Sequence, residues 1–220
     1  MRSTRAMELC DQGGRLLDLG KPEDSIPYFD GALMIDARLA MAWIGKAKAL
    51  HMLGRYEEAT ECYEEALEIE PRDPITWSSK GVALRMLERY EEAIECYDRA
   101  LEIDSSRAIT WSNKGVALDK LGRSEEAIRC FDKALKIEPR RASAWFNKGT
   151  ALVSLNRYGE AIECFERSLR IDPAQADAWY NKGVALRDMG RHDEALKCFS
   201  KASEIDPGIA EKRIKDLLGH

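Results

Sequence analysis

Cysteine is the residue type in this sequence with the clearest capacity for chemistry, and five of the six cysteines are evenly spaced. They stand 34 residues apart, whereas Cys10 breaks the interval: Cys62, Cys96, Cys130, Cys164 and Cys198. Cysteine thiolates can bind zinc, pair as disulfides or act as nucleophiles. No CxxC pair occurs, although that spacing is typical of zinc and redox sites. The elements that carry the spacing must therefore decide which role is possible.

Other residue types capable of catalysis form no recognisable constellation. The sequence has no Gly-rich phosphate loop, no HExxH zinc motif and no GxSxG nucleophile motif. Its three histidines are scattered: His51, His192 and His220. Most acidic residues fall on the outer face of predicted helices, where a solvated surface explains them better than acid–base pairs. We therefore predict that the chain is not an enzyme and needs neither a metal nor a cofactor.

The 34-residue interval extends over almost the whole chain. Tryptophan recurs at the same spacing: Trp43, Trp77, Trp111, Trp145 and Trp179. Residues 74–107 and 108–141 align without a gap at 21 identical positions. The repeats occupy residues 6–39, 40–73, 74–107, 108–141, 142–175 and 176–209, and the first of them has Leu9 in place of tryptophan. An internal repeat of this length predicts a stacked repeat architecture.

Each repeat has the pattern of two helices joined by a short turn. In residues 74–107, Trp77, Gly81 and Leu84 follow the spacing of one helix face, and Tyr97 and Ala100 lie on a second such face. Glycine occupies the turn in several repeats, where a left-handed residue commonly ends a helix: Gly54, Gly122 and Gly190. The pattern therefore predicts a helical hairpin for each repeat.

Proline and aspartate mark several expected helix ends. Asp73 before Pro74 is typical of an N-cap followed by a first-turn proline. In the first repeat, Pro27 falls within the second predicted helix and removes a backbone hydrogen bond. We therefore expect that helix to begin late, near Asp24.

The pattern resembles the tetratricopeptide repeat, a 34-residue helical hairpin with Trp at position 4, Gly at 8, Ala at 20, Phe or Tyr at 24, Ala at 27 and Pro at 32. Lysine at position 7 departs from the family pattern, and leucine replaces the aromatic residue at position 11. The resemblance implies an all-α fold, a right-handed α-α superhelix that forms a single array over residues 1–220. The segment 210–218, AEKRIKDLL, is predicted to be a capping helix.

This architecture gives the cysteines a packing role. They occupy position 23, which lies on the apolar flank of the second helix between the conserved alanine and isoleucine positions. Stacked helices lie about 8–10 Å apart, whereas a disulfide needs Cα atoms within about 7 Å. Zinc needs all its sulfur ligands at about 2.3 Å. We therefore expect these five cysteines to be buried, reduced and without metal.

The first helix of each repeat has a face that remains outside the packing sector. The family resemblance implies that these residues line a concave groove where ligands bind. The candidate groove residues are Met41, Ile44, Met52, Ile75, Ser79, Val82, Met86, Asn113, Phe146, Asn147, Tyr180 and Asn181. The early ones are mostly apolar and predict either a ligand surface or a surface shielded by the curl of the superhelix. The three asparagines share position 6 and could hold a peptide backbone.

The resulting prediction is a non-catalytic protein-interaction scaffold whose groove binds a peptide or helix of a partner. Two alternatives remain: a self-assembling scaffold whose groove accepts a terminal helix of another copy, and a regulatory repeat region of a larger enzyme complex. A chaperone C-terminal tail held by a carboxylate clamp is excluded, because position 9 is never Asn and position 2 is never basic.

Composition narrows the range of partners and compartments. The net charge is −5 with interspersed signs, which argues against nucleic-acid binding. No apolar run approaches the roughly 20 residues that a membrane helix needs. The first residues, MRSTRAMELC, contain no apolar signal segment, and regularly kept cysteines fit a reducing compartment. We therefore expect a cytoplasmic location with no membrane partner.

Overall fold

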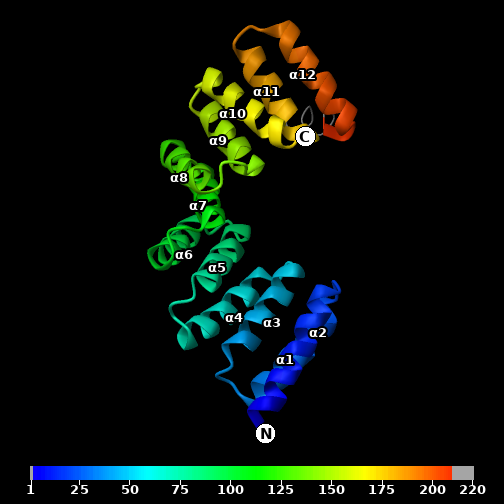
Figure 1. The fold of residues 1–220 in the computed structure, drawn as a ribbon, viewed down its shortest axis with the longest axis vertical. Coiled ribbons are helices and arrows are strands. Elements are labelled where there is room, and N and C mark those ends of the chain that lie inside the picture. The colour runs from blue at the N-terminus through cyan, green and yellow to red at the C-terminus, as the bar shows by residue number, and fades with distance from the viewer. Residues whose placement is uncertain (1, 210–220) are drawn as a thin grey trace. The chain divides into compact units, whose positions relative to one another are not determined.

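The computed structural model describes residues 2–209, which are α-helical with no strand among them. Figure 1 shows successive helices joined by short turns. The chain divides into two compact units, residues 1–117 (unit 1) and 118–220 (unit 2). The predicted capping helix, residues 210–218, lies outside the described residues.

Twelve helices follow one another along residues 2–209: α1 Arg2–Asp18, α2 Pro22–Ile35, α3 Ala40–Met52, α4 Tyr56–Ile69, α5 Pro74–Met86, α6 Tyr90–Ile103, α7 Ala108–Lys120, α8 Ser124–Ile137, α9 Ala142–Ser154, α10 Tyr158–Ile171, α11 Ala176–Asp188 and α12 His192–Ile205. This confirms two helices in each repeat. In unit 1, α1 packs against α2, α3 against α4 and α5 against α6, while α2 and α4 also contact the first helix of the following hairpin. In unit 2, α9 with α10 and α11 with α12 form the same arrangement.

Small and aromatic side chains interlock in the core of each hairpin. In several hairpins the glycine at position 8 faces the aromatic ring at position 24, and a Cβ added to the glycine would lie under 3 Å from that ring. The pairs are Gly13 with Phe29, Gly81 with Tyr97, Gly149 with Phe165 and Gly183 with Phe199. The ring therefore packs directly against the backbone of the first helix, which explains the glycine that recurs in the sequence.

Tryptophan and lysine tie each hairpin to the one before it. Every tryptophan donates its indole N–H to a carbonyl oxygen six residues earlier, as Trp77 does to Pro71 over 2.9 Å. The lysine at position 7 lies over the tryptophan ring of its own helix and reaches an acidic residue at position 25 of the preceding hairpin. These ion pairs join Lys46 to Asp30, Lys80 to Glu64, Lys114 to Asp98, Lys148 to Asp132 and Lys182 to Glu166. In the sequence these lysines stand out only as a departure from the family pattern.

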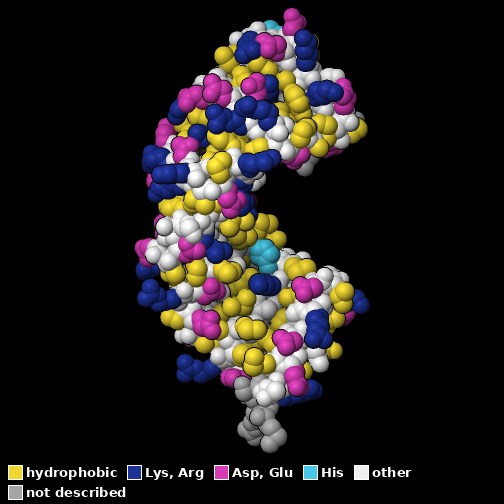
Figure 2. All heavy atoms as spheres, viewed as in Figure 1, with side chains coloured by type: hydrophobic (Ala, Val, Ile, Leu, Met, Phe, Trp, Pro, Cys, Tyr) yellow, Lys and Arg dark blue, Asp and Glu magenta, His cyan; other side chains and the backbone are white. Residues whose placement is uncertain are grey.

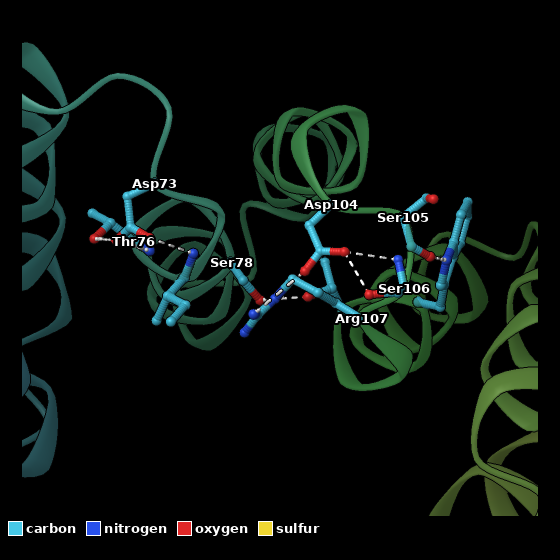
Figure 3. A network of polar contacts seen from close by, with 10 residues as sticks. Asp73, Thr76, Ser78, Asp104, Ser105, Ser106 and Arg107 are labelled. Atoms are coloured by element: carbon cyan, nitrogen blue, oxygen red, sulfur yellow. Dashed lines mark hydrogen bonds and ion pairs between the residues drawn. The ribbon is translucent and has the colours of Figure 1, made fainter.

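A polar network in unit 1 surrounds the starts of α5 and α7 (Figure 3). The Asp73 carboxylate accepts hydrogen bonds from the backbone N–H groups of Ile75 and Thr76, which confirms the predicted N-cap. Between the two helices, the Thr110 hydroxyl donates to the buried Ser78 hydroxyl over 3.1 Å. A buried side-chain hydrogen bond therefore links these two first helices.

Helix α2 begins at Pro22, so the expectation of a late start near Asp24 is wrong. Pro22 occupies the first turn, where a missing N–H leaves no hydrogen bond unmade. Pro27 lies inside the helix, and the helix continues through it because Phe29 and Ala32 are buried in the core with residues of α1 and α3. Tertiary burial outweighs the local cost of the proline.

The turn inside each hairpin requires a left-handed residue. Gly20, Gly54, Gly122 and Gly190 have φ between 70° and 78°, as predicted for the last three. Two other turns place an ordinary residue in this conformation: Glu88 with φ of 59° and Asn156 with φ of 57°. A left-handed conformation costs a residue with a Cβ roughly 1–2 kcal/mol.

We expect Glu88→Gly to stabilise the protein by about 1 kcal/mol, because glycine adopts this conformation without steric cost. The measurement is the free energy of unfolding in guanidinium chloride. The reverse change Gly54→Glu, at the equivalent turn position, is expected to destabilise by a similar amount. Equal stability of both variants and the parent would show that backbone conformation does not limit these turns.

Candidate functional site

Unit 1 contains a groove of about 860 Å³ lined by residues of α1, α3, α4 and α5, together with Phe29 of α2. Its lining includes five of the predicted groove residues: Met41, Ile44, Met52, Ser79 and Val82. Leu17 and Phe29 add further apolar surface. Hydrophobic side chains are exposed over this part of unit 1 (Figure 2). The repeat therefore brings together residues that are up to about 70 positions apart in sequence.

The methionines in the groove are exposed to an unusual degree for apolar side chains. Met41 is 56% exposed and Met52 is 54% exposed. They stand at positions 2 and 13 of the same helix, α3. Ile44 is half-buried between them. Methionine is flexible and adapts to irregular apolar partners, so this surface can accommodate a ligand side chain without rearranging the helix.

Charged residues stand at the rim of the groove. Asp11, Arg15 and Asp18 lie on α1, and Lys48 lies on α3. All four are exposed. Two acidic and two basic residues give the rim no net charge. The charged residues of the lining therefore do not favour either sign of charge.

Among the lining side chains, His51 has a polar atom without a hydrogen-bond partner. Its Nδ1 is buried and has no hydrogen-bond partner, and its ring packs edge-on against Tyr56 at 5.0 Å. Burial lowers the pKa of His51, and the nearby positive charge of Arg85 lowers it further. The imidazole is therefore neutral at pH 7 and leaves the base of the groove without charge.

Tyr63 and Ser79 contribute hydroxyl groups that already have partners. The Ser79 hydroxyl donates to the Ile75 carbonyl oxygen over 2.8 Å. Burial raises the pKa of Tyr63 to about 12, and a side-chain hydrogen bond with Ser79 opposes that rise. Both residues therefore close the groove rather than offering open hydrogen-bonding groups.

Three predicted residues of unit 1 do not line the groove. Ile75 and Met86 are on α5 and exposed, and Asn113 is half-buried on α7. Ile109, at the same repeat position as Ile75, is also exposed on α7. The exposed apolar surface of unit 1 therefore extends beyond the groove itself.

In unit 2, the remaining four predicted residues lie on α9 and α11 and are half-buried. Phe146 stacks against Phe165 with ring centroids 5.9 Å apart, and Tyr180 stacks against Phe199 at 5.3 Å. Asn147 and Asn181 occupy the same repeat position on adjacent first helices. Neither amide bonds to another residue in the described part of the chain. This surface is more polar than the groove of unit 1.

The cysteines occupy the core. All six fall within residues 2–209, are buried and form no disulfide, so their predicted burial is confirmed. Burial raises the pKa of Cys62, Cys96 and Cys164 to about 11. A thiol that stays protonated at pH 7 is a poor nucleophile and a poor metal ligand. Over the described range, no cluster of three histidine, cysteine or acidic residues has metal-binding geometry, and no helix is long and apolar enough to span a bilayer.

Sequence models of the tetratricopeptide repeat match residues 38–106, 72–140, 113–176 and 176–209, which together span residues 38–209. The chain is a tetratricopeptide repeat protein. None of the curated protein sequences matches it. The predicted family and the all-α hairpin fold are therefore confirmed.

Solved structures with the tetratricopeptide repeat fold cover most of this chain. YrrB, described as a TPR protein with an unusual peptide-binding site, is 26% identical with a TM-score of 0.67, over 83% of this chain and 94% of YrrB. PilF of Pseudomonas aeruginosa is 20% identical with a TM-score of 0.82, over 98% of each chain. PilW, described as a type IV pilus biogenesis factor, is 20% identical with a TM-score of 0.83, over 92% of this chain and 94% of PilW. At 20% identity, PilF and PilW show the fold alone.

Sequence reasoning missed the contribution of the first tetratricopeptide repeat to the groove. The lining residues of α1 are Cys10 at repeat position 5, Asp11 at 6, Gly14 at 9, Leu17 at 12 and Asp18 at 13. Lys48 at position 9 and His51 at position 12 of α3 also line the groove and were not predicted. Positions 5, 6, 9 and 13 are the ones at which groove residues were predicted in other repeats, so the same positions in the first repeat were the available signal.

Proposed function

We propose that this tetratricopeptide repeat protein is a non-catalytic interaction scaffold, and that the groove of unit 1 binds a segment of a partner protein. The observation that carries the proposal is the groove itself: an apolar hollow of about 860 Å³ that contains two methionines more than half exposed. Exposed apolar surface of this kind is typical of interaction sites. The peptide-binding site named for YrrB supports the same role for this fold.

The groove is shaped for contact rather than for a reaction. The one unpaired polar atom found among its lining side chains is the buried His51 Nδ1, and the imidazole is neutral. The buried thiol Cys10 has a raised pKa, because of burial and of the negative charge of Asp11. General acid–base or nucleophilic catalysis needs a group whose pKa and position suit proton transfer or attack. His51 Nδ1 is buried and the Cys10 thiol stays protonated, so neither group is placed for such a step, which supports a binding role. We also propose a reducing compartment such as the cytoplasm, which the six cysteines without a disulfide support.

We expect Met52→Glu to weaken the partner about 10- to 100-fold. Burial of a methionine side chain by the ligand contributes roughly 1.5–3 kcal/mol to binding. A glutamate carboxylate in its place would lose its hydration when the ligand binds, which costs free energy. The partner is captured from native lysate by the intact chain, identified by mass spectrometry and titrated by calorimetry.

Met34→Glu is the matched control for this experiment. Met34 is 89% exposed on α2 and does not line the groove, so the same chemical change there should leave the affinity unaltered. Equal affinity of Met52→Glu and Met34→Glu for the captured partner would reject the groove as the binding site. Capture of a second copy of this chain would instead identify self-assembly, and capture of an enzyme would identify a regulatory repeat region.

The surface of unit 2 suits a second contact with an extended stretch of a partner. Asn147 and Asn181 each offer a donor and an acceptor, with the aromatic rings of Phe146 and Tyr180 beside them on the same helices. An extended peptide presents backbone N–H and C=O groups that such amides can pair. We propose that these four residues bind the backbone of a partner segment.

We expect Asn147→Ala with Asn181→Ala to weaken such a segment about 5- to 100-fold, because each lost hydrogen bond contributes roughly 0.5–1.5 kcal/mol. The melting temperature should barely change, since alanine favours the helix. Titration calorimetry of the captured partner, with thermal unfolding followed in parallel, checks both expectations. A large fall in melting temperature would show that the amides stabilise the fold and do not serve a ligand.

A further inference from the structure

We infer that the groove of unit 1 binds its ligand as an amphipathic α-helix of a partner protein, not as an extended peptide. The inference rests on the proposed function of the groove and adds the conformation of the ligand. It follows from which hydrogen-bonding groups the groove offers and which it lacks.

An extended peptide needs partners for its backbone. Each residue carries one N–H and one C=O group, and a group buried without a partner weakens binding about tenfold or more. The apolar part of the groove lining includes Met41, Ile44, Met52 and Val82. None of these side chains can donate a hydrogen bond, and the backbone groups of α3 and α5 are used within their own helices.

The polar side chains nearer the base do not fill this need. The Ser79 hydroxyl already donates to the Ile75 carbonyl oxygen, and Tyr63 shares a hydrogen bond with Ser79. His51 Nδ1 has no partner but is itself buried, so it cannot serve the successive N–H and C=O groups of an extended peptide. In a helix, the backbone N–H and C=O groups form hydrogen bonds with one another. A helical ligand therefore loses the fewest hydrogen bonds when it enters an apolar groove.

The rim matches the two edges of such a helix. Within residues 2–209, none of Asp11, Arg15, Asp18 and Lys48 forms an ion pair. Some other surface charges of unit 1 are paired, as Arg55 is with Glu58 and Arg89 is with Glu92. A helix that buries an apolar stripe carries charged residues along both edges of that stripe. The four rim residues offer both signs of charge to meet them.

The test uses two display libraries of 18-residue peptides with the same composition, selected against the intact chain. One library places apolar residues at i, i+3, i+4 and i+7, the spacing of a helix face, and the other alternates apolar and polar residues, the spacing of an extended strand. We expect enrichment from the helix-patterned library and loss of that enrichment on the Met52→Glu variant. Met34→Glu should retain it.

Proline then tests the bound conformation of the best peptide. Proline in its centre should weaken binding at least about 100-fold, because an internal proline disrupts a helix. Proline at the first helical position should leave the affinity within about threefold, since helices tolerate it there. Titration calorimetry measures both peptides. Equal affinity of the two proline peptides would overturn the helix.

The outcomes separate this inference from the function on which it rests. Enrichment only from the alternating library, lost on Met52→Glu, would overturn the helix and leave the groove as a binding site. Enrichment that Met52→Glu does not reduce would reject the groove as the site. No enrichment from either library would overturn both.

Discussion

Leucine in place of Gly14 is expected to weaken groove binding about 100-fold while leaving the protein at least as stable as the parent. Gly14 lies in α1 and lines the groove of unit 1. A Cβ added there meets no atom within 4 Å. The new side chain therefore extends into the space that a ligand would fill, and displacing one anchoring side chain of the ligand removes roughly 1.5–3 kcal/mol.

Stability should not fall, because leucine favours a helix interior over glycine by close to 1 kcal/mol. Gly159→Leu is the matched control. Gly159 lies in α10 of unit 2, and a Cβ added there also meets nothing within 4 Å. That variant should gain similar stability and keep full affinity. Calorimetry with the captured partner and thermal unfolding of both variants measure the two quantities. Parent-like affinity of Gly14→Leu would mean that ligands do not enter this groove.

Alanine in place of Gly45 is expected to destabilise the protein by about 3 kcal/mol, the upper end of the usual cost of overpacking a core. An added Cβ would lie 2.5 Å from Phe29 Cζ and 2.8 Å from Phe29 Cδ1. The ring has little room to move, because it also packs against α1, where a Cβ at Gly13 would lie 2.8 Å from Phe29 Cε1. Phe29 is therefore held between the backbones of α1 and α3.

The free energy of unfolding in guanidinium chloride measures this cost. Gly159→Ala, in open space on α10, should stabilise the protein by about 0.5–1 kcal/mol and serves as the control. Phe29→Leu combined with Gly45→Ala should be less destabilising than the sum of the single changes, because the smaller side chain leaves room for the methyl group. If the effects of Phe29→Leu and Gly45→Ala on the free energy of unfolding were additive, the close packing of Phe29 against Gly13 and Gly45 would be contradicted. A Gly45→Ala variant as stable as the parent would contradict it as well.

The same two glycines show where sequence patterns reach their limit. The repeat frame predicts a glycine at position 8, which Gly13 fulfils, whereas Gly45 stands at position 6 and breaks the frame. Only the packed structure shows that both serve one ring. The sequence shows which residues share one face of a helix. Which residue of the neighbouring helix each of them contacts depends on the packing geometry of the two helices.

The groove was partly predictable for the same reason. Met41, Ile44 and Met52 fall on the face of α3 that helical periodicity leaves outside the packing sector, so their exposure follows from spacing alone. The participation of α1 was missed because its polar and small residues, such as Asp11 and Gly14, gave no apolar signal. A groove is formed by several helices packed together, so the pattern of apolar residues in one helix does not predict it.

The sequence by itself determined the hairpins, their turns, the burial of the cysteines and the membership of the tetratricopeptide repeat family. Each of these depends on local periodicity or on a motif repeated every 34 residues, and a repeat makes the same local signal visible many times. The tertiary structure alone decided that α2 begins at Pro22 despite Pro27, and that Lys80 pairs with Glu64 of the preceding hairpin. It also decided that the groove lies in unit 1. These features arise from contacts between residues far apart in sequence, whose free energies outweigh the local preferences that a sequence displays.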